Sequence, residues 1–283
     1  MTLHSDSKPS PVTWHLAHHG KPLRLLQISD SHLLEHPRQT LMGVNTERSF
    51  REVLIRFQNT EEWPPDLILV TGDLVQDPFP GAYKRLFDYL ENLEIPWACL
   101  PGNHDDPAMM ARIMCRKEQH CAGRILSRSW QIICLNSHRY DSHGGHLSPK
   151  ELEYLTGCLE ETPDLFTLIA LHHPPLSVGS TWMDTMRLDN GPELLDCLAR
   201  FPNVKGVIFG HVHQVFESEY RSIRLWSTPS TCFQFQPKSE TFALDVEAAG
   251  WRWLELYPNG QIHTWVKRLD HPPPDLDFSL AGY

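Results

Sequence analysis

Short apolar runs alternate with longer amphipathic segments along much of the chain. Such runs, flanked by Gly, Pro or polar residues, are typical of buried strands. Residues 45–57 instead place Phe50, Val53, Leu54 and Phe57 at helical spacing. The pattern predicts strands at 24–29, 67–70, 95–100, 130–135, 166–171 and 204–209, helices at 45–57, 83–90, 108–114 and 192–199, and a helix that begins at Ser148-Pro149.

After Gly210 the pattern becomes mostly β. It predicts strands at 214–220, 224–227, 242–246, 251–257 and 261–269, with a turn at Pro258-Asn259-Gly260. Periodicity alone therefore indicates a mixed α/β fold. We divide the chain into an N-terminal arm at 1–23 that is loose or forms a short edge strand, one domain at 24–270, and a Pro-rich tail at 271–283.

Five of the apolar runs end in a short polar cluster. In chain order the clusters are Asp30-Ser31-His32, Gly72-Asp73, Gly102-Asn103-His104-Asp105, His172-His173-Pro174 and Gly210-His211-Val212-His213. Because ligands in open α/β sheets bind beyond the carboxyl ends of the strands, five such ends suggest one site collected from five places.

The clusters supply the donor atoms of a metal site. They contain carboxylates, an amide and at least four imidazoles, with no Cys, which suits Mn, Fe or Zn and argues against a structural zinc knuckle. Seven donors exceed what one tetrahedral ion needs but fit two ions a few ångströms apart. Asp73 is the best bridging candidate, because its two carboxylate oxygens can each hold one ion. The amide oxygen of Asn103 suits a hard ion.

The ordered series Asp-x-His, Gly-Asp, Gly-Asn-His-Asp, His-His-Pro-Pro and Gly-His-x-His resembles the calcineurin-like metallophosphoesterases. Gly43-Val44-Asn45-Thr46, Gln76-Asp77 and Ala82-Tyr83 narrow the resemblance to the bacterial class III 3′,5′-cyclic-AMP phosphodiesterases, over residues 24–269. Gln76 stands where a purple acid phosphatase would have a metal-binding Tyr. The same segment lacks the Asp-Arg-Gly of the protein Ser/Thr phosphatases.

The resemblance implies a four-layer αββα sandwich of two facing mixed sheets with flanking helices. It also implies two divalent metal ions, which we expect to be Fe and/or Mn. One ion would be held by Asp30, His32, Asp73 and His213, and the other by Asp73, Asn103, His172 and His211.

His104 is assigned to the substrate, because its side chain should diverge from that of the adjacent Asn103. It could contact the phosphate and protonate the leaving oxygen, or it could be a structural His held by Asp105. The substrate is also expected to contact His32, Asp73, Asn103 and His213. His173 is expected to support the ligands by hydrogen bonding.

Two further groups of residues have alternative interpretations. His138, His143 and His146 could line the substrate mouth or lie on a solvated loop. Trp182, Phe233 and Phe235 could stack on a purine or belong to the core.

Composition excludes some classes of protein. A formal net charge of -10 disfavours nonspecific binding to nucleic acid or to a membrane. Seven scattered Cys without Cys-x-x-Cys are typical of a reduced cytosolic chain rather than a disulfide framework. With no signal-peptide pattern and no apolar stretch long enough to span a membrane, we expect a cytoplasmic protein that is a monomer or homodimer.

The expected reaction is metal-dependent hydrolysis of 3′,5′-cyclic AMP to 5′-AMP by a hydroxide that two ions generate at neutral pH. An alternative is a broader phosphodiesterase that acts on glycerophosphodiesters or other nucleotides. A non-catalytic metal-binding scaffold is a further alternative, although such a protein would usually show broken ligand positions, and here each position is filled.

Overall fold

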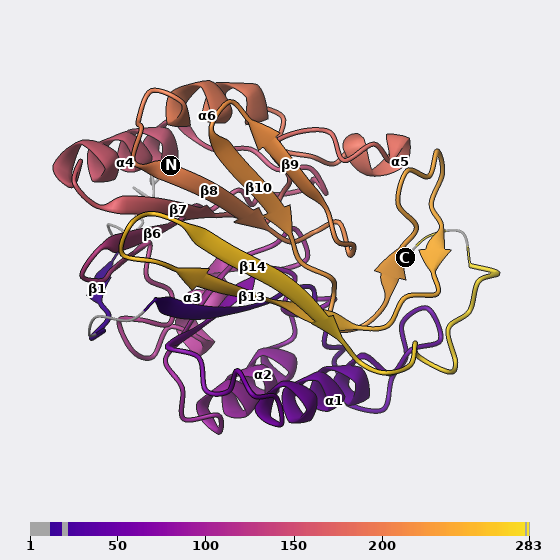
Figure 1. Ribbon diagram of the computed structural model, residues 1–283. Coiled ribbons are helices and arrows are strands. Elements are labelled where there is room, and N and C mark those ends of the chain that lie inside the picture. The colour runs from indigo at the N-terminus through magenta and orange to yellow at the C-terminus, as the bar shows by residue number, and fades with distance from the viewer. Residues whose placement is uncertain (1–11, 19–21, 281, 283) are drawn as a thin grey trace, which may run out of the picture.

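Two facing sheets with helices on their outer sides form the four layers of the fold, as the resemblance predicted (Figure 1). The computed structural model describes residues 12–18, 22–280 and 282. Helices α4 (Pro149–Glu161) and α6 (Gly191–Leu198) cover one sheet, and α1 (Thr46–Gln58) and α2 (Pro80–Glu91) cover the other. Three hydrophobic clusters fill the three spaces between the four layers.

The smaller of the two large sheets has five strands in the order β14-β13-β2-β3-β4. Their bounds are Ile262–Arg268, Gly250–Leu256, Leu23–Ile28, Leu67–Thr71 and Trp97–Leu100. The three strands β2, β3 and β4 are parallel, so their carboxyl ends meet at one edge. Alternate side chains face opposite sides: Leu67 and Leu69 pack between the sheets, whereas Ile68 and Val70 pack under the helices.

The larger sheet has seven strands in the order β1-β5-β6-β7-β8-β10-β9. Their bounds are Thr13–His15, Arg124–Leu126, Trp130–Cys134, Phe166–Ala170, Val204–Phe209, Ile223–Ser227 and Glu217–Tyr220. Strands β6, β7 and β8 are parallel and carry the His-His and Gly-His-x-His segments at their ends. A two-stranded sheet joins β11 (Gln234–Phe235) to β12 (Leu244–Asp245).

Helices α1 and α4 each start with a capping side chain, and the cap of α4 was predicted. The Asn45 side chain accepts a hydrogen bond from the Arg48 N–H at the start of α1. Ser148 caps α4 in the same way, with Pro149 as the first helical residue. The remaining helices are α3 (Pro107–Ile113), which the pattern placed at 108–114, and the short α5 (Thr181–Asp184), which the pattern missed.

Strand lengths differ from the predictions where side chains alternate poorly. The strand expected at 242–246 is reduced to Leu244–Asp245, and the strand expected at 214–220 begins only at Glu217. Strand β1 lies at the edge of the larger sheet, within the arm that was predicted to be loose or to form a short edge strand, whereas β5 was not predicted, because three residues are too short for a periodic pattern. Residues 1–11 and 19–21 of the expected N-terminal arm lie outside the described residues.

The C-terminal segment has no helix or strand among its described residues after Arg268. It is nevertheless attached to the domain, because the Asp277 N–H donates to the Met42 carbonyl, 2.9 Å away, and Leu276 packs against the core under α4 and α6. None of the described helices is long and apolar enough to cross a membrane.

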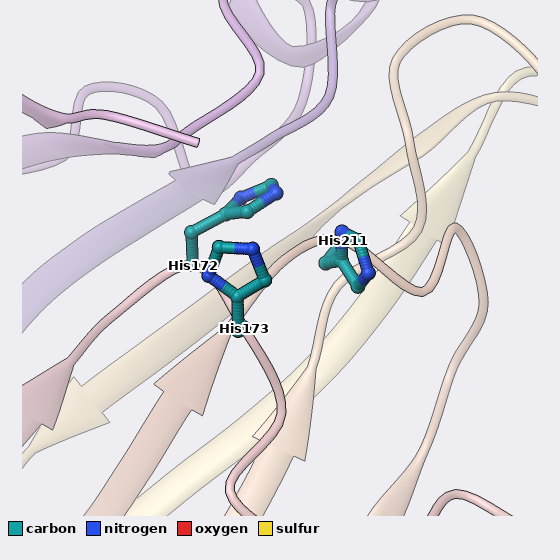
Figure 2. Close-up of side chains that lie close together, drawn as sticks. All are labelled: His172, His173 and His211. Carbon is teal, nitrogen blue, oxygen red and sulfur yellow. The ribbon is translucent and has the colours of Figure 1, made fainter. Parts of the chain in front are cut away.

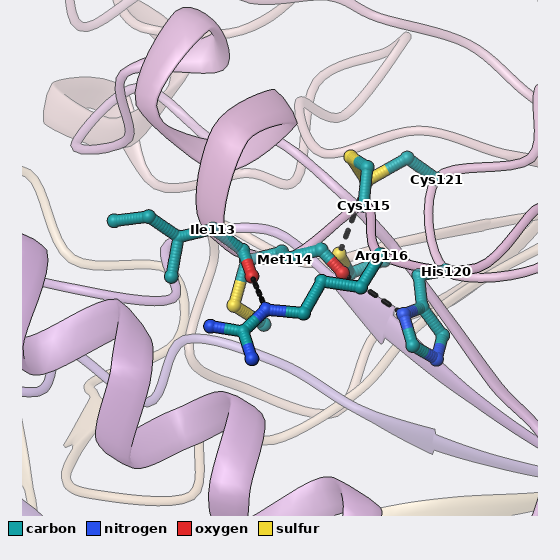
Figure 3. The surroundings of a disulfide bond; sticks show 7 residues. Ile113, Met114, Cys115, Arg116, His120 and Cys121 are labelled. Carbon is teal, nitrogen blue, oxygen red and sulfur yellow. Dashed lines mark hydrogen bonds between the residues drawn. A yellow bond between two sulfur atoms is a disulfide. The ribbon is translucent and has the colours of Figure 1, made fainter.

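One cysteine pair departs from the expected reduced chain. Cys115 and Cys121 form a disulfide in the turn that follows α3 (Figure 3). The turn brings the two Cα atoms to 5.3 Å, within the range that a disulfide can bridge, and sequence spacing does not show this. Cys99 and Cys134 are buried thiols, as predicted from their apolar surroundings.

Candidate metal centre

The five polar clusters meet at the edge where the parallel strands of both sheets end. Potential ligand atoms within 4.8 Å of one another form overlapping groups from Asp30, His32, Asp73, His104, His172, His173, His211 and His213. Figure 2 shows His172 and His173, which follow β7, gathered with His211, which follows β8. The structure thus brings together residues separated by more than 180 positions in the sequence.

Asp30, His32 and His213 form one side of the centre, and all are fully buried. The His213 Nε2 lies 3.5 Å from an Asp30 carboxylate oxygen and 3.1 Å from the His32 Nε2. The His211 backbone N–H donates to both Asp30 oxygens, at 3.1 Å each, which ties the loop after β8 to the loop after β2.

Asp73 lies between this side and the other. Its Oδ2 is 3.7 Å from the His32 Nε2 and 3.2 Å from the His172 Nε2. The His172 Nε2 is also 3.2 Å from the Asn103 Oδ1. The His211 ring completes this second side, with its centroid 5.1 Å from that of His172. A carboxylate in this place can reach both sides, as a bridging ligand must.

Two glycines permit this close approach of side chains to backbone. A Cβ at Gly72 would lie 2.4 Å from the His172 Nδ1, and one at Gly102 would lie 2.1 Å from the Asp73 Oδ1. Gly72 also has a φ of +96°, which favours glycine. The Gly before Asp73 and the Gly before Asn103 are therefore required by packing at the centre.

Outer hydrogen bonds set the orientation of three imidazole rings. The Nδ1–H of His172 donates to the Thr71 carbonyl at 2.8 Å, and that of His213 donates to the Phe233 carbonyl at 2.9 Å. The Nδ1–H of His32 donates to the Gln76 side-chain oxygen at 2.9 Å. Each of these rings therefore directs Nε2 inward, which is the arrangement that metal-binding imidazoles adopt.

Five residues of the centre have left-handed backbone conformations. These are Asp30, His32, Asp73, His211 and His213, with φ between 43° and 68°. Each such conformation costs on the order of 1 kcal/mol for a residue with a Cβ, so surrounding contacts must enforce it. Strain concentrated on the inward-pointing side chains is typical of a functional site.

The donor set fits a divalent cation. The Asp73 Oδ2 and the His211 Nε2 are buried and have no hydrogen-bond partner, and buried polar atoms are rarely left so. If the Nδ1 atoms of His32 and His213 carry the ring hydrogens, the inward Nε2 atoms of the two rings have lone pairs that point toward each other. Cations held between these atoms would satisfy all of them.

The ionisable groups of the centre shift the pKa values of one another. Burial raises the pKa of Asp73, but the charges on His172 and His104 outweigh it and hold that pKa well below its usual value. Burial lowers the pKa of His172, but the Asp73 carboxylate outweighs this and raises it to about 9. Burial lowers the pKa of His32 to about 3 and that of His211 well below its usual value, which keeps both rings neutral.

His104 lies beside the centre on its half-buried side. Its backbone N–H donates to the Asp73 Oδ1 at 2.9 Å, and its Nδ1–H donates to the Gln76 carbonyl at 3.0 Å. Gln76 therefore orients both His32 and His104.

Asp105, which could have held His104, instead accepts hydrogen bonds from the Gly102 N–H and the Tyr83 hydroxyl. Burial together with the Asp73 charge raises the pKa of Asp105 to about 7.

His173 is close to the other imidazoles, but both of its ring nitrogens contact protein atoms. Its Nδ1 accepts from the Ser137 hydroxyl at 2.8 Å, and its Nε2–H donates to the His143 carbonyl at 3.2 Å. These contacts join His173 to the segment between β6 and α4, and neither partner is a predicted ligand, so its support of the ligands by hydrogen bonding stays a prediction. Ser137 was not predicted from the sequence, because a single Ser outside the clusters has no distinguishing pattern.

The aromatic residues proposed for purine stacking lie mainly in the core. Phe233 and Phe235 are fully buried, and the Phe235 ring stacks on His213 with centroids 4.3 Å apart. Trp182 is partly buried against Phe235 and Phe242. The two Phe residues therefore support His213 from behind and are not accessible to a substrate.

Comparison with known proteins agrees with this geometry. Residues 23–215 match the calcineurin-like phosphoesterase family, and the chain belongs to that family. It is 40% identical to the 3′,5′-cyclic adenosine monophosphate phosphodiesterase of Haemophilus influenzae, over 92% of this chain and 95% of the relative. It is 41% identical to a 3′,5′-cyclic-nucleotide phosphodiesterase of Nostoc, over 90% of this chain and 94% of the relative.

Solved structures share the fold at much lower identity. A dimetal phosphatase from Danio rerio is 13% identical with a TM-score of 0.58, and the match covers 88% of this chain and 99% of the other. GAP50, the anchor in the inner membrane complex of Plasmodium, is 16% identical with a TM-score of 0.57, and the match covers 89% and 90%. These two similarities show the fold alone, and the function has to be argued from the residues of the site.

Proposed function

We propose that this member of the calcineurin-like phosphoesterase family hydrolyses 3′,5′-cyclic AMP to 5′-AMP with two divalent metal ions. The observation that carries the proposal is the buried Asp73 carboxylate, whose Oδ2 has no hydrogen-bond partner and lies between two sets of inward-facing donors. The identity of the proposed substrate is based on relatives that are 38–41% identical to this chain. These relatives are named as cyclic-nucleotide phosphodiesterases and match over at least 90% of this chain.

The ligand assignment follows the two sides of the centre. Asp30, His32 and His213 would hold one ion, and Asn103, His172 and His211 the other, with Asp73 shared. Both ions are expected to be Mn or Fe, since mixed imidazole and carboxylate donors suit them. Bound in this way, divalent ions supply Lewis acidity toward the phosphoryl group and lower the pKa of a bound water.

The chain itself binds and orients the diester. The inward donors are buried, whereas His104 is half-buried at their edge, so the phosphoryl group would enter from the side of His104. His104 directs Nε2 away from Gln76, because its Nδ1–H is used by the Gln76 carbonyl. From that position the doubly protonated ring can donate a hydrogen bond from its Nε2–H to the leaving 3′ oxygen and transfer that proton to it as the P–O bond breaks, which leaves a neutral ring with its hydrogen on Nδ1.

The test is chromatography of 3′,5′-cyclic AMP incubated with protein loaded with Mn²⁺, with and without a chelator. We expect 5′-AMP to appear only when metal is present. If a generic aryl phosphodiester is cleaved but cyclic AMP is not, the centre stands and the proposed substrate is wrong. If neither is cleaved with Mn²⁺ or with Fe²⁺ under anaerobic conditions, the proposed activity is wrong.

A further inference from the structure

A loop between β6 and α4 lies at the edge of the metal centre and carries His143. The His143 Nδ1 is 3.4 Å from the Asn103 Nδ2, and its ring centroid is 5.7 Å from that of His104. His143 is exposed to solvent, in contrast to the buried ligands. It therefore stands on the solvent side of the two residues that would face an incoming substrate.

This loop is held in place by His173. The carbonyl of His143 accepts from the His173 Nε2–H, and the Ser137 hydroxyl at the start of the loop donates to the His173 Nδ1. Gly145 lies directly on the imidazole, since a Cβ there would be 2.5 Å from the His173 ring atoms. The loop is also fixed on its far side, where the Asp189 N–H donates to the Gly145 carbonyl.

The contact with Asn103 fixes which nitrogen of His143 can donate. Asn103 directs its oxygen toward His172, so its amide N–H groups face His143. The His143 Nδ1 accepts from that amide, and the ring hydrogen is then on Nε2. The Nε2–H is a donor on the solvent side, where it can meet an acceptor of a bound molecule.

We propose that His143 binds the nucleoside part of the substrate through this donor, and that His173 is the positioning residue that holds His143 in place. This inference rests on the proposed function. Burial supports the choice of the nucleoside: the Asp and His donors that face the metals are buried, Asn103 and His104 are half-buried, and His143 is exposed. A phosphoryl group bound at the level of the buried donors leaves the ribose and base at the level of His143.

The test measures binding directly, by calorimetry of 5′-AMP and of inorganic phosphate added to Mn-loaded protein. In His143→Ala we expect the affinity for 5′-AMP to fall about five- to tenfold, the usual effect of losing one hydrogen bond, while the affinity for phosphate is unchanged. His143→Gln should restore part of the loss, because its amide can donate. The KM for cyclic AMP should rise with kcat nearly unchanged.

His146→Ala is the matched control, because His146 lies on the same loop but its Nδ1 is 2.6 Å from Asp189 on the outer side. It should leave both affinities unchanged. Gly145→Ala tests the positioning role of His173, since the added methyl group must displace the loop or the ring. It should weaken 5′-AMP binding as His143→Ala does, and should add little to the effect of His143→Ala in the double variant.

Several results would overturn the inference. Unchanged affinity for 5′-AMP in His143→Ala would show that His143 does not contact the nucleoside. Equal losses for 5′-AMP and phosphate, or a loss of Mn²⁺ affinity, would show that His143 acts on the phosphoryl group or through Asn103. A failure of the proposed function would look different. In that case the wild-type protein would not hydrolyse cyclic AMP, although its affinity for 5′-AMP would still depend on His143.

Discussion

Buried histidines occur in two regions of this molecule, and their surroundings differ. In the turn after α3, His120 is fully buried and its ring stacks on Trp97, with centroids 3.8 Å apart. Its Nδ1–H donates to the Met114 carbonyl at 2.9 Å, as Figure 3 shows, and its Nε2 lies 3.1 Å from a Glu91 oxygen. The Nδ1 therefore has an acceptor in the protein, whereas the Nε2 faces a single carboxylate without a hydrogen bond, and His120 belongs to none of the ligand groups found among the described residues.

At the strand ends, the outer nitrogens are held in the same way, but the inner nitrogens converge on one another and on the carboxylates of Asp30 and Asp73. Thr71, Gln76 and Phe233 accept from the outer nitrogens. The inner nitrogens of His32 and His213 approach each other at 3.1 Å. The difference teaches that burial of a histidine does not identify a site, whereas convergence of several inner nitrogens on carboxylates does.

The variant with the largest expected effect removes the Asp73 carboxylate charge, which the two sides of the metal centre share. Asp73→Asn keeps the size of the side chain but removes the carboxylate between the two sides. We expect metal content to fall below two ions per chain and turnover to fall at least about 10³-fold, because metal ions supply several kcal/mol of charge stabilisation. Metal analysis and 5′-AMP formation measure these effects.

Asp66→Asn is the matched control for that variant. Asp66 lies at the opposite end of β3 and accepts from the Arg24 N–H at 2.8 Å. Metal content and turnover should stay near wild type. An Asp73→Asn protein that keeps two ions and full turnover would contradict the bridging role.

His104 should separate catalysis from metal binding. In His104→Ala we expect turnover to fall by about 10²- to 10³-fold, in the range of general acid catalysis, with both ions retained. The reason is that His104 sits at the half-buried edge of the centre, where in the proposed reaction its Nε2 would face the leaving oxygen. Unchanged turnover would refute this role, and loss of metal would make His104 a ligand.

For substitution of His120 we expect a loss of stability with little change in turnover or metal content. His120→Ala removes a buried ring that fills the space beside Trp97, and we expect the free energy of unfolding to fall by about 2–4 kcal/mol. Turnover and metal content of the folded protein should stay within about twofold of wild type. Urea unfolding and metal analysis provide the two measurements, and a metal-deficient but stable variant would break the comparison.

The smallest expected effect is the pH dependence of metal binding. The pKa of His172 is raised to about 9 by Asp73, so below pH 9 its ring is protonated and must lose a proton to bind a metal. The affinity for Mn²⁺ should therefore fall by up to about tenfold for each unit that the pH drops from 9 toward 7. Calorimetry in buffers of different ionisation enthalpy should detect the released proton, and an affinity that does not change from pH 7 to 9 would contradict this prediction.

Much of the fold was predictable because its signals are local. Apolar runs placed β2, β3, β7 and β8 within a residue or two, helical spacing placed α1, and the capping signal Ser148-Pro149 placed the start of α4. The short strand β5 was not predictable, because its stability comes from the neighbouring strands rather than from its own pattern. The Cys115–Cys121 disulfide was missed because it depends on how the turn after α3 folds.

The sequence by itself determined which donor atoms the centre contains and in what order they stand along the chain. Tertiary structure alone decided which nitrogen of each imidazole points inward, because the acceptors that fix the rings of His172 and His213 are backbone carbonyls, which every residue type has. It also decided that Gln76 orients two histidines and that His143 lies beside Asn103. These contacts join residues 20 to 101 positions apart, and no local spacing rule reaches that far.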